Sequence, residues 1–102
     1  MSFESVDQVI ESVRDDPQPP AGVTPELQAM WLARKGEWHA AHDIAQDIDT
    51  PLGSWIHAHL HLLEGDLGNA GYWYRRAGKP ARPPEEAEQG WREIVAELIG
   101  GV

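Results

Sequence analysis

The sequence has no cysteine, few basic residues and no long apolar run. The absence of cysteine among its 102 residues excludes disulfides and thiolate metal sites. Eight basic residues stand against 17 acidic ones, and the resulting net charge of -9 repels phosphate backbones and anionic lipid. We therefore expect no nucleic-acid and no membrane role. No apolar stretch is long enough to span a bilayer, so no membrane-spanning helix is predicted.

Secretory features and strand patterns are missing as well. The opening run MSFESVDQVIES has acidic residues and no basic region ahead of an apolar run, so we expect no secretory signal. A cytoplasmic protein is the resulting expectation. No run of residues alternates between apolar and polar, so no sheet is predicted. A chain of this length forms one domain, which we place at residues 1–102.

Apolar residues recur at helical spacing along the chain, which predicts an all-α fold with about six helices. Residues 1–16 predict an N-terminal helical arm that docks on the rest, with Ser2 as its cap. The pairs Thr24-Pro25 and Thr50-Pro51 each give a capping side chain followed by a first-turn proline, and such pairs start helices. Residues 84–100 predict a C-terminal capping helix.

An internal repeat lies between residues 24 and 80. The run GEWHAAHDIAQDI, which begins at Gly36, aligns with GDLGNAGYWYRRA, which begins at Gly65. Each run follows a helix that starts at Thr-Pro, so each half predicts a helical hairpin with a glycine-acid corner. The helix after Gly36 is expected to reach about Ile48 and to fray there. The small residues expected to face one another in the two hairpins are Ala29 with Ala41, and Ala58 with Ala70.

This pattern resembles the tetratricopeptide repeat, whose hairpin has a small residue in its first helix and a glycine-acid corner. The second hairpin matches the repeat in order at Ala58, Gly65, Asp66, Ala70, Tyr74, Ala77 and Pro80. The first hairpin matches at Ala29, Gly36, Glu37 and Ala41. The resemblance implies two tetratricopeptide-like hairpins at 24–80 with flanking helices as caps, and a protein or peptide interaction module. The run GNAGYWYRRAG is also similar to a motif of small bacterial proteins, a similarity that implies no activity.

All five histidines lie between residues 39 and 61. His57, His61 and Glu64 share one face of a predicted helix, and His42 on the preceding helix can supply a further ligand. Imidazole and carboxylate groups on facing helices bind zinc or another divalent metal. A metal-binding protein or hydrolase that uses these four residues is therefore one hypothesis. The alternative, which the sequence favours, has no cofactor and uses His57 and His61 as buried, hydrogen-bonded structural residues.

Aromatic and basic residues concentrate after the second corner. Arginine forks and aromatic faces are enriched where binding energy concentrates, so this stretch predicts a surface for an acidic protein or peptide, or for a second copy of the chain. The same cations could bind a small anion instead, or could merely favour the helix C-terminus through its dipole. The candidate binding residues of this surface and of the adjoining groove are Trp55, His59, Leu62, Tyr72, Trp73, Arg75, Arg76 and Lys79.

An interaction module is the function that the sequence favours, and a metal-binding protein or hydrolase is the alternative. No serine has a motif context that would activate it as a nucleophile, and cysteine is absent. The sequence therefore does not favour an enzyme.

Overall fold

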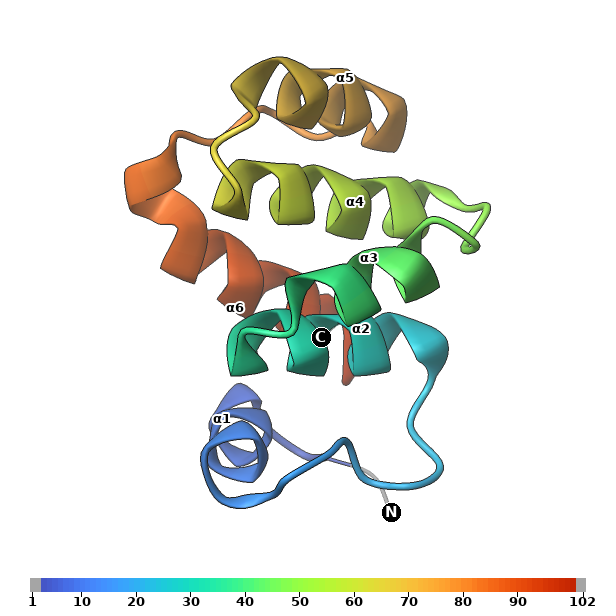
Figure 1. Cartoon of the computed structure of the whole chain (residues 1–102), viewed down its shortest axis with the longest axis vertical. Helices are drawn as coiled ribbons and strands as arrows, with labels where there is room; N and C mark the ends of the chain where they lie inside the picture. Colours follow the sequence, from blue (N-terminus) through green and yellow to red (C-terminus); the bar gives the residue numbers. More distant parts are fainter. Residues whose placement is uncertain (1–2, 101–102) are drawn as a thin grey trace.

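The computed structural model describes residues 3–100, and all regular structure in them is helical (Figure 1). The predicted all-α class with about six helices is confirmed for this part of the chain, which contains no strand. The predicted cap Ser2 lies outside the described residues. The elements are α1 (Val6–Asp15), α2 (Pro25–Lys35), α3 (Trp38–Ala45), α4 (Pro51–Leu63), α5 (Leu67–Ala77), the short 3-10 helix η1 (Pro84–Glu86) and α6 (Ala87–Leu98).

The helix boundaries follow from local chemistry. The N–H of Leu27 donates to Thr24 Oγ1 at 3.2 Å, and the N–H of Gly53 donates to Thr50 Oγ1 at 3.1 Å, so both predicted Thr-Pro starts are confirmed. Helix α2 ends at Gly36, whose φ of 94° places it in the left-handed region that glycine adopts without a steric penalty. These signals fix where each hairpin begins and turns.

Two boundaries differ from the prediction. Helix α1 is capped by Ser5, which accepts a hydrogen bond from the N–H of Gln8. Helix α3 ends at Ala45, earlier than the expected end near Ile48. The N–H of Ile48 donates to the carbonyl of Ala45 at 3.0 Å, so the last turn tightens as helices often do where they fray. Asp47 lies in this turn, where its charge opposes the helix dipole.

The helices stack along the long axis of the molecule (Figure 1). Helix α2 packs on α3, and α4 packs on α5, so each predicted hairpin forms a contacting pair. Helix α3 also touches α4, which joins the two hairpins. Helix α6 runs down one side and contacts both α2 and α4. Helix α1 lies against α2 and α6 and closes the lower end of the stack.

Helix α4 is the centre of the fold. It contacts α2, α3, α5 and α6, and every residue from 55 to 62 is buried. A helix surrounded in this way has no solvated face for its polar side chains. The three histidines of α4 therefore lie inside the protein. The indole N–H of Trp38 donates to the carbonyl of Leu60 at 2.7 Å and holds α3 against α4.

The N-terminal helix α1 packs against α2 and α6. Val9 is fully buried, and the indole N–H of Trp31 donates to Ser12 Oγ at 3.0 Å. The ammonium group of Lys35 donates to the carbonyls of Val13 and Asp16, both at 2.8 Å, and so covers the end of α1. Helix α1 thus shields one side of the core and stays away from the histidines.

The alanines of the second hairpin give a stability prediction. Ala58 and Ala70 are 0% and 2% exposed, so a larger side chain at either position has to displace its neighbours. Ala70→Leu is expected to lower the free energy of unfolding by roughly 1–3 kcal/mol through overpacking. Urea denaturation measures the change, and Ala40→Leu, on the exposed side of α3, is the matched control. Equal denaturation midpoints for the two variants would contradict the tight α4–α5 contact.

Candidate functional site

Three histidines meet where α3 faces α4. His42 comes from α3, and His57 and His61 come from α4 at a spacing of four residues. The Nε2 atoms of His42 and His57 lie 2.9 Å apart, so one ring donates a proton to the other. The rings of His57 and His61 are stacked with centroids 4.9 Å apart, and the ring of His42 stands nearly perpendicular to both. The three predicted metal-ligating histidines therefore form one cluster.

Two tryptophans flank this histidine cluster. The ring of Trp73, from α5, stacks on His57 with centroids 4.0 Å apart. The ring of Trp38, from α3, stacks on His42 at 4.9 Å. Sequence reasoning placed Trp73 on a binding surface and did not connect Trp38 with the histidines. The four-residue spacing of Trp38 and His42 on one helix is the signal that could have predicted their contact.

Glu64 orients one of the three rings. Its Oε1 lies 2.7 Å from His61 Nδ1. Because an ionised carboxylate can only accept a hydrogen bond, His61 Nδ1 carries a proton, and Nε2 is the ring nitrogen that can offer a lone pair. Glu64 thus contacts the cluster through His61 alone, and its carboxylate lies on an imidazole. This is the arrangement that fixes the tautomer of a metal-ligating histidine.

Burial keeps His42 and His57 uncharged at neutral pH. His57 and His61 are 7% and 9% exposed, and His42 is half-buried. Burial, together with the neighbouring imidazoles of His42 and His61, lowers the pKa of His57 from 6.5 to about 4. Burial and the proximity of His61 also lower the pKa of His42. At neutral pH both rings are therefore free of the proton that would compete with a metal ion.

The spacing of the nitrogens suits a metal ion. One ring nitrogen from each of His42, His57 and His61 lies within 4.8 Å of the other two. Three nitrogens at about 2.0–2.1 Å from one zinc ion in tetrahedral geometry lie roughly 3.3 Å apart, so small side-chain rotations close the set. A small cavity of about 130 Å³ reaches the edge of His57 and Trp73 and gives access from solvent. The cluster is therefore a histidine-rich group that could bind a metal.

A second group of possible ligands shares one histidine. His61, Glu64 and Asp66 also offer ligand atoms that lie within 4.8 Å of one another. Asp66 and Glu64 are exposed, and Asp66 Oδ2 accepts a hydrogen bond from the side-chain amide of Asn69 at 2.8 Å while the aspartate caps α5. Because its carboxylates already serve a cap and an imidazole, this group is the weaker of the two.

The predicted groove residues do not line an open groove. Trp55, His59 and Leu62 are 9%, 1% and 2% exposed. They share one face of α4, and helix α6 packs against α4. Helix α6 of the same chain thus covers the surface that the sequence analysis predicted to bind a partner. His59 and Trp55 line two separate pockets at its edges.

The basic residues after the second corner are exposed. Arg75, Arg76 and Lys79 are accessible to solvent, and we call these three residues the basic patch. The guanidinium of Arg76 lies 5.2 Å from the ring centroid of Trp73 and donates to the hydroxyl of Tyr72 at 3.1 Å. The ammonium of Lys79 lies 4.2 Å from the ring centroid of Trp55. Two of the three cations thus lie against aromatic rings, Arg76 against Tyr72 and Trp73 and Lys79 against Trp55.

Comparisons with known proteins give no match. No family model matches the chain, and neither a curated protein nor a solved structure is significantly similar to it. Within residues 3–100, no helix combines the length and the apolar character needed to cross a bilayer. The resemblance to tetratricopeptide repeats therefore stays a prediction, and the function has to be argued from the site itself.

The lowered pKa of His57 gives a pH prediction. Its folded pKa of about 4 lies below the ordinary 6.5, so the unfolded state takes up the proton first on acidification. The contribution of His57 to stability is complete above about pH 6.5 and is lost as the pH falls toward 4. His57→Gln is expected to reduce this loss by roughly 1–3 kcal/mol. Urea denaturation of the metal-free protein, carried out at several pH values between about 4 and 6.5, measures this loss of stability in the wild type and in the variant.

The control for the pH experiment is another histidine. His39 lies on α3 near the cluster but is exposed and outside it. His39→Gln is expected to keep the wild-type dependence of stability on pH. A pH profile that His57→Gln and His39→Gln alter equally would show that burial of the cluster does not set the acid sensitivity.

Proposed function

We propose that this protein binds one divalent transition-metal ion at His42, His57 and His61, with zinc as the preferred ion. The observation that carries the proposal is the convergence of three ring nitrogens from two helices within 4.8 Å of one another. Imidazole is a common ligand for zinc, copper and nickel, whereas magnesium and calcium prefer oxygen ligands. The absence of cysteine leaves histidine as the main ligand type for such an ion in this sequence.

Three features of the surroundings support this proposal. Glu64 holds His61 in the tautomer whose Nε2 has a free lone pair. The low pKa values of His42 and His57 keep their nitrogens unprotonated at neutral pH. The two flanking indoles stack on His42 and His57 and so cover one face of each of these rings. A metal ion would replace the single proton now shared between His42 and His57.

The proposed ligand set is that of a binding site with one open position. Three protein ligands leave the fourth tetrahedral position of zinc to water or to a ligand from solution. A hydrolase would need a base near that position, and Glu64, the predicted fourth member of the set, is engaged by His61. We therefore propose metal binding, and we do not extend the proposal to hydrolysis.

Isothermal titration of metal-free, untagged protein with zinc tests the proposal. One ion per chain is expected, together with a rise in melting temperature because zinc binds the folded state. His57→Gln removes the central ligand and is expected to abolish stoichiometric binding. His39→Gln is the matched control, since it removes an exposed histidine of α3 outside the cluster. Absence of zinc binding to the wild type, or unchanged binding to His57→Gln, would refute the site.

Glu64→Gln separates the orienting role of the carboxylate from ligation. Glutamine can still accept a hydrogen bond from His61 but lacks the charge that increases the basicity of the ring. Zinc affinity is expected to fall by about 10–100-fold with the stoichiometry unchanged. A complete loss of binding would instead identify Glu64 as a direct ligand.

A second candidate function rests on the basic patch. Among the residues that the structure describes, Arg75 makes no hydrogen bond or ion pair, although the protein has a large acid excess. Arg82, a nearby cation, is neutralised by Glu86 and Glu93 and does not contribute. A shallow cavity of about 280 Å³ beside Lys79 and Trp55 offers room for a side chain. We propose that this surface binds an acidic peptide segment of a partner protein.

Charge reversal tests the basic patch. Arg75→Glu with Arg76→Glu is expected to leave helicity and melting nearly unchanged, because both side chains are exposed. The same change should abolish a complex detected by sedimentation or affinity capture. Salt should weaken the wild-type complex, since exposed charges are screened over about 8 Å at physiological ionic strength. If the double variant retains its partners at full affinity, the basic patch has no role in binding and is only solvated surface.

A further inference from the structure

Helix α5 forms one end of the helical stack and leaves one of its faces uncovered (Figure 1). It packs against α4 and makes no comparable contact with any other helix in residues 3–100. A solvent-accessible stripe of α5 consists of Leu67, Gly68, Gly71, Tyr72 and Arg75, and we call these five residues the α5 face. A stack of helical hairpins that ends on an uncovered helix has a surface available for a partner.

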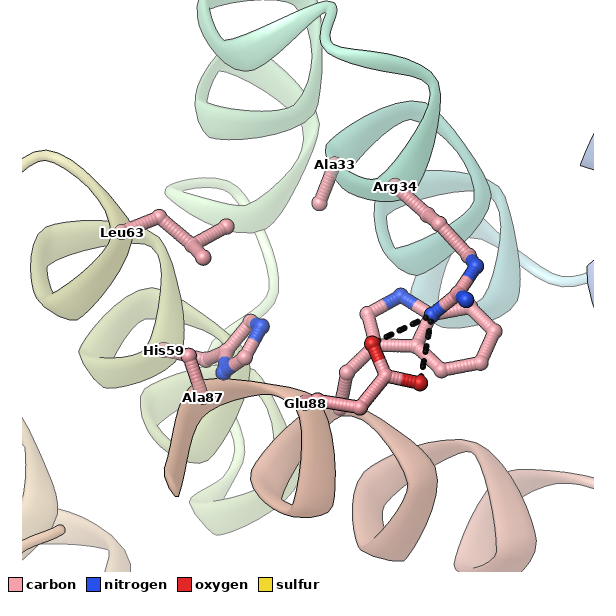
Figure 2. Close-up of a pocket in the computed structure, with 7 residues that line it drawn as sticks. Ala33, Arg34, His59, Leu63, Ala87 and Glu88 are labelled. Atoms are coloured by element: carbon pink, nitrogen blue, oxygen red, sulfur yellow. Dashed lines mark hydrogen bonds and ion pairs between the residues drawn. The ribbon is translucent and has the colours of Figure 1, made fainter. Parts of the chain in front are cut away.

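The α5 face carries exposed apolar side chains. Leu67 is 52% exposed and Tyr72 is 44% exposed, and Leu63 is the one other large apolar side chain with comparable exposure in the described part of the chain. Figure 2 shows Leu63 at the pocket where α2, α4 and α6 meet, so Leu63 does not belong to the α5 face. Exposed apolar side chains that gather on one face are typical of interaction surfaces.

Two glycines leave the backbone of α5 bare between these side chains. A Cβ atom placed on Gly68 would meet no atom outside the helix's own backbone within 4 Å, and one placed on Gly71 would meet only Arg75 Nη1, at 3.6 Å. Packing inside the chain therefore requires neither glycine, although glycine weakens a helix interior relative to alanine. A bare helix backbone allows a second helix to approach closely.

Positive charge collects at the C-terminal end of the α5 face. The segment 67–82 contains four basic residues and no acidic one. Arg82 is neutralised by one glutamate of η1 and one of α6, and the other three cations are the basic patch. Asp49 and Glu97 border the cavities beside the basic patch, but within the described residues neither forms an ion pair with it. The basic patch thus has three cations without an ion-pair partner in the same chain.

Negative charge lies at the other end of α5. Glu64 and Asp66 are exposed at the corner that precedes the helix. Two antiparallel α5 helices would place the C-terminal end of each beside the N-terminal end of the other, so each basic patch would meet the acidic corner of the partner subunit. The two helix dipoles would also oppose each other, which is the favourable arrangement. The α5 face and its two ends are therefore complementary to a second copy of themselves.

Arg76 and the acidic corner also lie on the same side of α5, the side toward α3. Arg76 borders a cavity with the turn that follows α3. The carboxylates of Glu64 and Asp66 lie near His61, whose ring is 6.1 Å from that of Trp38 in α3. A two-fold axis between antiparallel helices carries each side of one helix to the same side of the other. Arg76 of one chain would therefore reach the acidic corner of the other.

We propose that two copies of the chain form a symmetric dimer through the α5 face, with their α5 helices antiparallel. In the register centred between Gly71 and Tyr72, each Tyr72 ring lies over Gly71 of the partner subunit. Arg76 then lies opposite Leu67 of the partner subunit, next to Asp66 of the partner subunit. A two-fold contact of this kind is self-complementary and closes without further copies.

This inference rests on the proposed binding role of the basic patch. It identifies the acidic segment that the patch binds as the corner Glu64-Gly65-Asp66 of a second copy. Helix α5 has 11 residues, so a contact through one of its faces is small and the dimer is weak. A dissociation constant on the order of 10–100 µM is expected.

Sedimentation equilibrium of the untagged protein, with a chelator present, measures this association. From about 5 to about 500 µM protein, the fitted mass should rise from 11.3 kDa toward twice that value, and added salt should oppose the rise. A mass of one chain across this range overturns the dimer. The binding of another acidic protein by the basic patch is then judged separately, by affinity capture with the charge-reversed variant.

Gly68→Gln separates dimerisation from folding. The new side chain has open space in the single chain, so helicity and melting temperature should be kept or raised. The same side chain would hold the two helices apart, and the dissociation constant is expected to rise at least about tenfold. Ala40→Gln, on the exposed side of α3, is the matched control and should dimerise as the wild type does. Equal dimerisation of the two variants would overturn the proposed contact.

A charge-exchange experiment tests the register. Arg75→Glu with Arg76→Glu should prevent self-association. Glu64→Lys with Asp66→Asn should weaken it, and asparagine at position 66 can still cap α5. An equal mixture of the two variants should restore a dimer in sedimentation, because each basic end then faces an acidic one. If the mixture stays monomeric while circular dichroism shows both variants to be helical, the acidic corner is not the segment that the patch binds.

Discussion

The burial of helix α4 on every side is the constraint on which the rest of the structure depends. Four helices surround it, and three of its interior side chains are imidazoles. Each of these must find a partner, lose its charge or remain unpaired. His57 pairs with His42, His61 pairs with Glu64, and His59 has no partner among residues 3–100. Burial thus has a different outcome at each of the three histidines, and the proposed metal site includes two of them.

Local signals made much of the fold predictable. The Thr-Pro starts, the glycine after α2 and the apolar spacing act over a few residues, and the structure confirms the helices that they predict. The clustering of His42 with His57 and His61 was predictable because helical spacing puts two of them on one face. The hydrogen-bond partner of His57 was not predictable from the sequence, since its identity depends on how α3 lies on α4. That partner is His42, which comes from the other hairpin.

The covered groove shows where sequence reasoning reached its limit. Trp55, His59 and Leu62 lie on one face of α4, as spacing requires, but spacing does not reveal what packs on that face. Helix α6 returns across it, and this long-range contact depends on Gly90 and on the indole of Trp91. Arg34, Glu88 and Trp91 come together only through that return, from positions more than fifty residues apart in the case of Arg34 and Glu88. No local pattern marks such a set.

The position of the histidine cluster has a mechanical consequence. His42 belongs to the first hairpin, and His57 and His61 belong to the second, so the cluster lies at the joint between two units that are each held together by their own internal packing. A single hydrogen bond between imidazoles now crosses that joint beside the Trp38 contact. An ion bound between these rings would therefore add one link to the packing of α2, α3 and α6 that already holds the two hairpins together. A ligand set drawn from both hairpins would thus act as a cross-link between two parts of the chain that no covalent bond other than the backbone joins.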